Sequence, residues 1–106
     1  MHNCFRDGEI LYCNQELGGW QRALHVIDIS NPSRPEELAT YTMKRTSVGD
    51  GIGPHNTWIQ DDLLYWAYYY AGVRILDVRE PTCPMEIGYY RTPYAWSAQP
   101  HDDGLF

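Results

Sequence analysis

Apolar and polar residues alternate with a period of two through much of this chain, which is the pattern of half-buried β-strands. Within residues 23–30, Leu24 and Val26 would lie on one face of a strand, and His25 and Ile27 on the other. No segment has a convincing helical period, and frequent Gly, Pro, Asn and Asp residues separate the alternating runs. The pattern therefore predicts eight strands, at residues 2–6, 9–15, 23–30, 36–43, 55–60, 63–70, 73–79 and 85–92.

The predicted strands form two copies of one four-strand unit. Residues 26–41 (VIDISNPSRPEELATY) align with residues 75–90 (ILDVREPTCPMEIGYY) at an offset of 49. The copies open with His2-Asn3 and His55-Asn56, which align at an offset of 53. The first copy therefore carries an insertion of four residues, which we place within NQELGGWQR.

A third copy begins near the end of the sequence, where Pro100-His101 matches Pro54-His55 at an offset of 46. Four antiparallel strands that repeat every ~40 to 50 residues are typical of the blades of a β-propeller.

Short turn motifs connect the strands. Asp7-Gly8 and Asp61-Asp62 predict two-residue hairpin turns, and Ala71-Gly72 predicts a further turn. Asp28 and Asp77 end the third strand of each copy, just before a Pro-x-x-Pro turn. Because Asp side chains readily accept backbone N–H groups two residues on, we expect both carboxylates to stabilise these turns.

The third strands and the turns that follow them, LHVIDISNPSRP and VRILDVREPTCP, resemble the LVIVD repeat, which forms the blades of a family of bacterial and archaeal surface propellers. The resemblance implies an all-β fold with two four-stranded antiparallel β-propeller blades plus the first strand of a third. Blade 1 would span residues 1–43 and blade 2 residues 55–92, with a linker at 44–54; residues 93–106 would form another linker and the start of the third blade. The longer linker KRTSVGDGIGP departs from the family's pattern.

Two blades cannot close a ring, because a propeller typically has four to eight blades. The simplest interpretation is a fragment of a longer propeller, whose remaining blades are its partners. The alternative is a short chain that assembles with copies of itself.

The chain is acidic, with 14 Asp and Glu against 8 Lys and Arg and a net charge of −6. This charge argues against nucleic acid as a partner. No apolar run approaches the roughly 20 residues of a membrane span, and no signal peptide is visible. The resemblance to surface propellers implies an extracellular or cell-surface location.

The three cysteines, Cys4, Cys13 and Cys83, have no metal-binding spacing. A turn at Asp7-Gly8 would place Cys4 opposite Leu11, so that Cys4 and Cys13 become diagonal neighbours and a disulfide between them would need distortion. We therefore expect buried or half-buried free thiols.

His2, His55 and His101 occupy equivalent positions, one in each copy. In a propeller the first strand of each blade lines the central channel, so these imidazoles would point toward one axis and could hold Cu, Fe or Zn, with Asp102 as an outer hydrogen-bond acceptor. The carotenoid cleavage oxygenases, propellers that hold iron with one His from each of several blades, are similar at the level of the fold. The alternative is that each His only hydrogen-bonds to a neighbouring blade, since residues that follow the repeat usually serve the repeat.

The run WAYYYAG is the densest aromatic stretch. With a period of two, one face of this strand would carry Trp66, Tyr68 and Tyr70, and the other Tyr65, Ala67 and Tyr69. Large residues on both faces favour a strand packed between blades. The alternative is a platform for a carbohydrate or peptide at the mouth of the channel, for which the candidate residues are Asn56, Trp58, Tyr68 and Trp96.

Two functions follow from these patterns. The first is a non-enzymatic binding or interaction scaffold, part of a larger surface or secreted β-propeller protein. The second is a metal-dependent propeller enzyme, similar to an oxidoreductase, in which one His per blade holds the metal.

Overall fold

A computed structural model describes residues 3–15, 23–42, 54–68, 72–92, 95 and 97–99. Within these residues lie eight strands and no helix: β1 Asn3–Asp7, β2 Ile10–Asn14, β3 Ala23–Asp28, β4 Glu36–Thr42, β5 Thr57–Gln60, β6 Leu63–Ala67, β7 Val73–Asp77 and β8 Met85–Tyr90. All eight predicted strands are confirmed, with slightly different ends. The proposed insertion after residue 15 and the predicted third-blade strand lie mainly or wholly outside the described residues.

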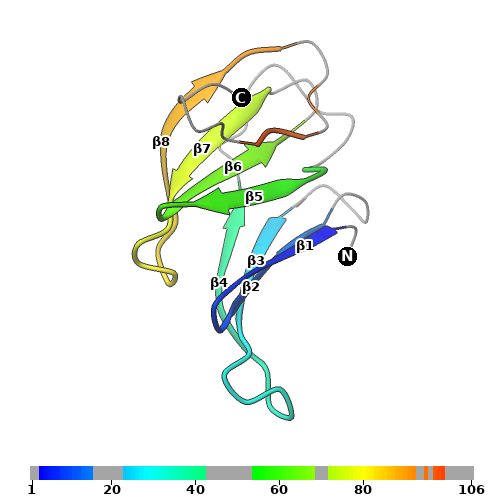
Figure 1. The fold of residues 1–106 in the computed structure, drawn as a ribbon, viewed down its shortest axis with the longest axis vertical. Helices are drawn as coiled ribbons and strands as arrows, with labels where there is room; N and C mark the ends of the chain where they lie inside the picture. Colours follow the sequence, from blue (N-terminus) through cyan, green and yellow to red (C-terminus); the bar gives the residue numbers. More distant parts are fainter. Residues whose placement is uncertain are drawn as a thin grey trace.

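The strands form two four-stranded antiparallel sheets, in the orders β1-β2-β3-β4 and β5-β6-β7-β8. Within each sheet, every strand pairs with its neighbour in sequence, as expected for antiparallel strands that follow one another along the chain. The two sheets lie one against the other, and the first strand of the second sheet, β5, contacts β1 and β2 of the first (Figure 1).

The turn between β1 and β2 is formed by Gly8 and Glu9, so the predicted turn at Asp7-Gly8 is wrong by one residue. Gly8 has a φ of 62°, and a glycine in this region at the first central position is typical of type II′ hairpins. The strand consequently extends through Asp7, which pairs with Ile10. A slip of one residue changes every cross-strand neighbour in the hairpin.

The corrected register changes the chemistry of the cysteines. Cys4 pairs directly with Cys13, with 4.1 Å between their Cα atoms, and the two form a disulfide. The expectation of free thiols at these two positions is therefore wrong. Cys83 is a free cysteine, but an exposed one.

The other predicted two-residue turn, Asp61-Asp62, is confirmed. Both residues are left-handed, with φ of 53° and 62°, as a type I′ hairpin requires. Gly72, in the turn predicted at Ala71-Gly72, is also left-handed, with φ of 77°; Ala71 lies outside the described residues.

The Pro-x-x-Pro turns are alike in the two sheets. The amide of Ser30 donates to the Asp28 carboxylate over 2.8 Å, and the amide of Arg79 donates to the Asp77 carboxylate over 3.0 Å. These hydrogen bonds lower the pKa of both carboxyl groups; at Asp77 the Arg79 side chain is the largest cause. The structural role expected of the two aspartates is confirmed.

Each sheet carries one bulge at an equivalent place. The register of β3 against β4 shifts between Val26 and Ile27, and that of β7 against β8 shifts between Ile75 and Leu76. The extra residues are Leu38 in β4 and Ile87 in β8, so the bulge is a repeated feature of the two sheets.

The main core lies between the two sheets. Its buried members from the first sheet are Tyr12, Leu24 and Val26, and those from the second sheet and its ends are Ile59, Leu64, Trp66, Tyr68, Leu76 and Val78. Partly buried Phe5, Ile10, Leu38, Ala39 and Tyr41 of the first sheet pack against them. Leu24 and Val26, which the sequence places on one face of this strand, are both fully buried.

The opposite face of the second sheet is partly covered as well. Ala67 and Val73 form a smaller buried cluster with Ala95 and Ala98, and Tyr65 packs against it. Large or buried residues therefore occupy both faces of β6, as the sequence of its aromatic run predicts.

Candidate functional site

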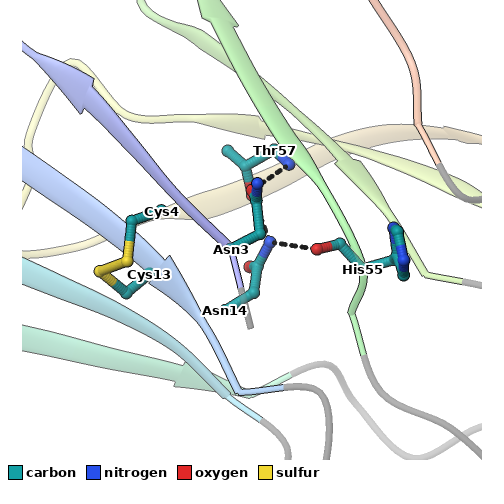
Figure 2. Close-up of a disulfide and its surroundings, with 6 residues drawn as sticks. All are labelled: Asn3, Cys4, Cys13, Asn14, His55 and Thr57. Atoms are coloured by element: carbon teal, nitrogen blue, oxygen red, sulfur yellow. Dashed lines mark hydrogen bonds between the residues drawn. A yellow bond between two sulfur atoms is a disulfide. The ribbon is translucent and has the colours of Figure 1, made fainter. Parts of the chain in front are cut away.

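The two sheets are joined by a small polar network where β1 and β2 meet β5 (Figure 2). Asn14 is fully buried at the end of β2. Its Nδ2 donates to the His55 carbonyl oxygen over 3.2 Å and to Thr57 Oγ1 over 2.8 Å. Its Oδ1 accepts a hydrogen bond of 2.8 Å from Trp66 Nε1. The side-chain amide thus contacts the second sheet at three points.

Asn3 adds a fourth contact from β1. It pairs with Asn14 across the hairpin, so the two side chains lie on the same face. Asn3 Oδ1 accepts a hydrogen bond of 3.2 Å from the backbone amide of Thr57. We call these five residues, Asn3, Asn14, His55, Thr57 and Trp66, the inter-sheet clamp. Buried polar groups that are satisfied in this way fix one arrangement of the surfaces they join.

The disulfide lies directly beside the clamp (Figure 2). Cys4 follows Asn3 in β1, and Cys13 precedes Asn14 in β2. Because neighbouring residues of a strand point to opposite faces, the disulfide ties the hairpin together on the face away from the clamp.

The clamp is not a feature of every copy. At the offset of 53, Asn14 corresponds to Ala67 in the second sheet, and Trp66 corresponds to Cys13 in the first. Asn3 and Asn56 are the pair that the two copies share. At these aligned positions, the acceptor Asn14 occurs only in the first hairpin and the donor Trp66 only in the second.

The predicted metal ligands are only partly described. His55 lies just before β5, with its amide bonded to the Ala67 carbonyl oxygen and its carbonyl bonded to Asn14. Its imidazole points away from the two asparagines (Figure 2). His2 and His101 lie outside the described residues. Within the described part of the chain, no group of three or more His, Cys, Asp or Glu side chains is placed to hold a metal ion. A metal at the three histidines stays a prediction.

The predicted ligand-binding residues fall into two places. Trp58 is 37% exposed, and its ring lies 5.3 Å from that of Phe5, which occupies the equivalent position in β1. Asn56 precedes Trp58 by two residues and is half-buried. Tyr68 is instead buried in the main core, with its ring 5.0 Å from Trp66 in an edge-on contact. Trp96 lies outside the described residues, and a binding role for these four residues stays a prediction.

A charged pair sits beside the contact between the sheets. Arg74 is buried, lies 3.4 Å from Glu86 and is placed 4.7 Å above the ring of Tyr89. Tyr41 of the first sheet lies edge-on to Trp66. Burial and, less strongly, Glu86 raise the pKa of the Tyr41 hydroxyl, while Arg74 opposes them.

The first sheet repeats this pair with a histidine. His25 corresponds to Arg74, and its Nδ1 lies 2.7 Å from Glu37, which corresponds to Glu86. Its other ring nitrogen lies 3.1 Å from Gln15 Oε1. Hydrogen bonds from Thr40 and from His25 lower the pKa of Glu37. His25 is half-buried, and both of its ring nitrogens are hydrogen-bonded.

Sequence reasoning missed Asn14 and Thr57, the centre of the clamp. Asn14 is an ordinary polar residue at the end of a strand, and its partners lie 41 to 52 residues away. The only signal was the shared Asn3 and Asn56, which marked this end of the first strand as a part of the repeat.

Two four-stranded sheets with the same strand order, Pro-x-x-Pro turns and bulges make this an all-β repeat protein. The chain belongs to the LVIVD repeat family, which matches residues 18–43 and 55–92, that is, 64 of the 106 residues. No curated protein and no solved structure matches the chain. Within the described residues, no helix is both long and apolar enough to cross a membrane.

Proposed function

We propose that the two sheets are neighbouring blades of a β-propeller, and that this propeller is a non-enzymatic scaffold for binding other molecules. One observation carries the first half of the proposal. Leu38 and Tyr41 of β4 pack against the core between the two sheets, whereas their equivalents in β8, Ile87 and Tyr90, are 57% and 65% exposed.

This difference follows from a stack in which each sheet offers the same face to the next. The first sheet offers Tyr12, Leu24, Val26 and Tyr41 to the second. The equivalent residues of the second sheet, Tyr65, Val73, Ile75 and Tyr90, lie on its opposite face. A contact of this head-to-tail kind can be repeated from sheet to sheet, and it closes into a ring when the rotation between neighbouring sheets allows closure. The remaining blades of a parent chain, or copies of this chain, would supply the next face.

The scaffold role is supported by residues at the edge of the contact between the two sheets. Phe5 and Trp58 place two aromatic rings side by side on the first strands of the two sheets, and the half-buried Asn56 lies two residues before Trp58. A partly exposed Trp with a neighbouring amide suits a peptide or a carbohydrate, which offer apolar faces and hydrogen-bonding groups together.

The disulfide supports an extracellular or cell-surface location for the scaffold. Disulfides form and persist in oxidising compartments and are rare in reducing ones. The Cys4–Cys13 bond therefore fits a protein that works in an oxidising, extracellular environment.

A metal-dependent enzyme is the second candidate, and the observation in its favour is the recurrence of His at the start of each copy. The experiment that separates the two candidates combines metal analysis with a binding screen on the purified protein. For a scaffold, we expect no stoichiometric Cu, Fe or Zn, and binding to a member of a panel of peptides and neutral oligosaccharides. Trp58→Ala should weaken that binding about tenfold or more, since exposed aromatic anchors often dominate a binding surface.

His55→Ala is the matched control, because it should leave binding unchanged in a scaffold. Stoichiometric metal that disappears in His55→Ala would contradict the scaffold and support the enzyme.

A further inference from the structure

We propose that the Cys4–Cys13 disulfide controls the inter-sheet clamp, so that a dithiol reductant which opens the disulfide loosens the hold of the first sheet on β5. This inference concerns a switch within the chain, and it does not depend on the scaffold role. It rests on the exposure of Cys4 in this chain, because a further blade packed on the disulfide-bearing face of the first sheet would cover Cys4.

The placement of the disulfide carries the inference. All four hydrogen bonds of the clamp pass through Asn3 and Asn14. Each of these residues is the direct chain neighbour of one half-cystine, Cys4 or Cys13. The covalent bond therefore fixes the spacing of β1 and β2 at the end of the hairpin where the clamp is made.

The first hairpin needs this support more than the second does. β1 and β5 are both edge strands, so each pairs with a single neighbour, β2 or β6, and the difference lies in what holds each hairpin in place. In the second sheet the positions equivalent to Cys4 and Cys13 are Thr57 and Trp66, and Trp66 is held in place by burial in the main core. A disulfide restricts the freedom of the segment that it closes, and opening it returns that freedom to the edge strand.

The disulfide is open to attack from one side. Cys4 is exposed, whereas Cys13 is buried. A thiolate of the dithiol attacks Cys4 Sγ and forms a mixed disulfide, while Cys13 leaves as a thiolate and takes up a proton. The second thiolate of the dithiol then attacks the mixed disulfide, so Cys4 leaves and is protonated. The dithiol ends oxidised to a disulfide, and the protein gains two electrons and two protons. Exposed disulfides are commonly the labile and regulatory ones.

Hydrogen exchange in the intact chain tests the switch. The protein is prepared with Cys83→Ser, which removes the exposed free thiol, and is compared before and after treatment with dithiothreitol. Two reporters belong to the clamp: the Thr57 amide, which donates to Asn3, and the Trp66 indole N–H, which donates to Asn14. We expect both to exchange about tenfold faster or more after reduction, with two thiols newly available to alkylation.

Two amides away from the clamp serve as internal controls. The Ile29 amide donates to the Glu9 carbonyl in the first sheet, and the Val78 amide donates to the Asp62 carbonyl in the second. Their exchange should change less than about twofold. The double substitution Cys4→Ser and Cys13→Ser should show fast clamp exchange both with and without dithiothreitol.

Three results would overturn the proposal. The first is a disulfide that resists dithiothreitol in the folded protein. The second is complete reduction with unchanged exchange at Thr57 and Trp66. The third is equal acceleration at all four reporters, which would mean that reduction unfolds the chain generally. The protein that retains Cys4 and Cys13 is tested directly by reduction with dithiothreitol. The proposal can therefore be contradicted even if the double variant does not fold.

Discussion

The backbone around Gly72 leaves no room for a side chain at this position. It is left-handed, with φ of 77°, and a Cβ at this position would lie 2.2 Å from the Tyr90 carbonyl oxygen and 2.9 Å from Arg91 Cα. Both obstacles are backbone atoms, so no rotation of a side chain can relieve the clash. We expect Gly72→Ala to lower the free energy of unfolding by about 2 kcal/mol or more, measured by urea denaturation.

Gly8 provides the matched control for that substitution. It is also left-handed, with φ of 62°, but nothing lies within 4 Å of the position of its Cβ. Gly8→Ala should therefore cost only the conformational penalty of a left-handed alanine, about 1 kcal/mol. Equal losses at the two glycines would contradict the close approach of Gly72 to Tyr90.

Residue roles could be predicted where they depend on near neighbours. Asp28 and Asp77 were assigned correctly, because each accepts a hydrogen bond from an amide two residues on. The pairing of Cys4 with Cys13 could not be assigned, because it depends on which two residues form the turn, and Asp7-Gly8 is as good a turn signal as Gly8-Glu9. A single step in register decided between a disulfide and two free thiols.

At the scale of elements, the join between β1, β2 and β5 depends on one buried amide. Asn14→Ala would leave the Trp66 Nε1 and the Thr57 Oγ1 in the buried seam without their partner. Unsatisfied buried polar groups cost about 1 to 3 kcal/mol each, so we expect a loss of about 2 to 4 kcal/mol in the free energy of unfolding. Urea denaturation gives the value, and the Trp66 indole resonance in the NMR spectrum reports the lost bond.

Trp66→Phe and the double variant complete a thermodynamic cycle with Asn14→Ala. If the hydrogen bond between the two side chains is formed, the double variant should lose about 1 kcal/mol less unfolding free energy than the sum of the two single variants. Strict additivity would show that Asn14 and Trp66 act independently, against the geometry of the clamp.

The strands themselves were the most predictable elements. Alternation such as that of Leu24 and Val26 depends on local chain geometry alone, which is why all eight strands were found. The clamp was not predictable, because Asn14 acquires its partners only when two separate hairpins come together. The bulges at Leu38 and Ile87 were missed for a related reason, since a bulge is defined by the strand opposite it.

At the scale of the molecule, the internal repeat was the most informative signal. It identified the LVIVD family and the two sheets, because matched positions such as Asp28 and Asp77 serve the same turn in both copies. The copies also differ at matched positions. His25 and Arg74 are equivalent in the repeat, yet only the arginine is buried.

The proposed blade arrangement makes a prediction about two adjacent tyrosines. Tyr89 and Tyr90 are similarly exposed, at 61% and 65%, but they project from opposite faces of β8. Tyr90 is equivalent to Tyr41, which packs against the next sheet, and a further blade would cover it in the same way. In protein purified from its native cells, hydroxyl-radical labelling should modify Tyr90 several-fold more slowly than Tyr89.

Tyr89 is the control for that comparison, since it has the same side chain and the same strand. Equal labelling of the two tyrosines would show that nothing covers the outward face of the second sheet, and the propeller arrangement would then be wrong.

The single occurrence of the Asn14–Trp66 bond makes the two modules distinguishable despite their common backbone. A chimera that repeated the first module would set a half-cystine where the indole belongs, and one that repeated the second would set Ala67 where the amide belongs. Shuffling of these units, whether by gene duplication or by engineering, therefore preserves the junction only when the asparagine and the tryptophan travel as a matched set. The order of modules along the polypeptide is specified by side-chain complementarity, because the strand pattern alone would accept either order.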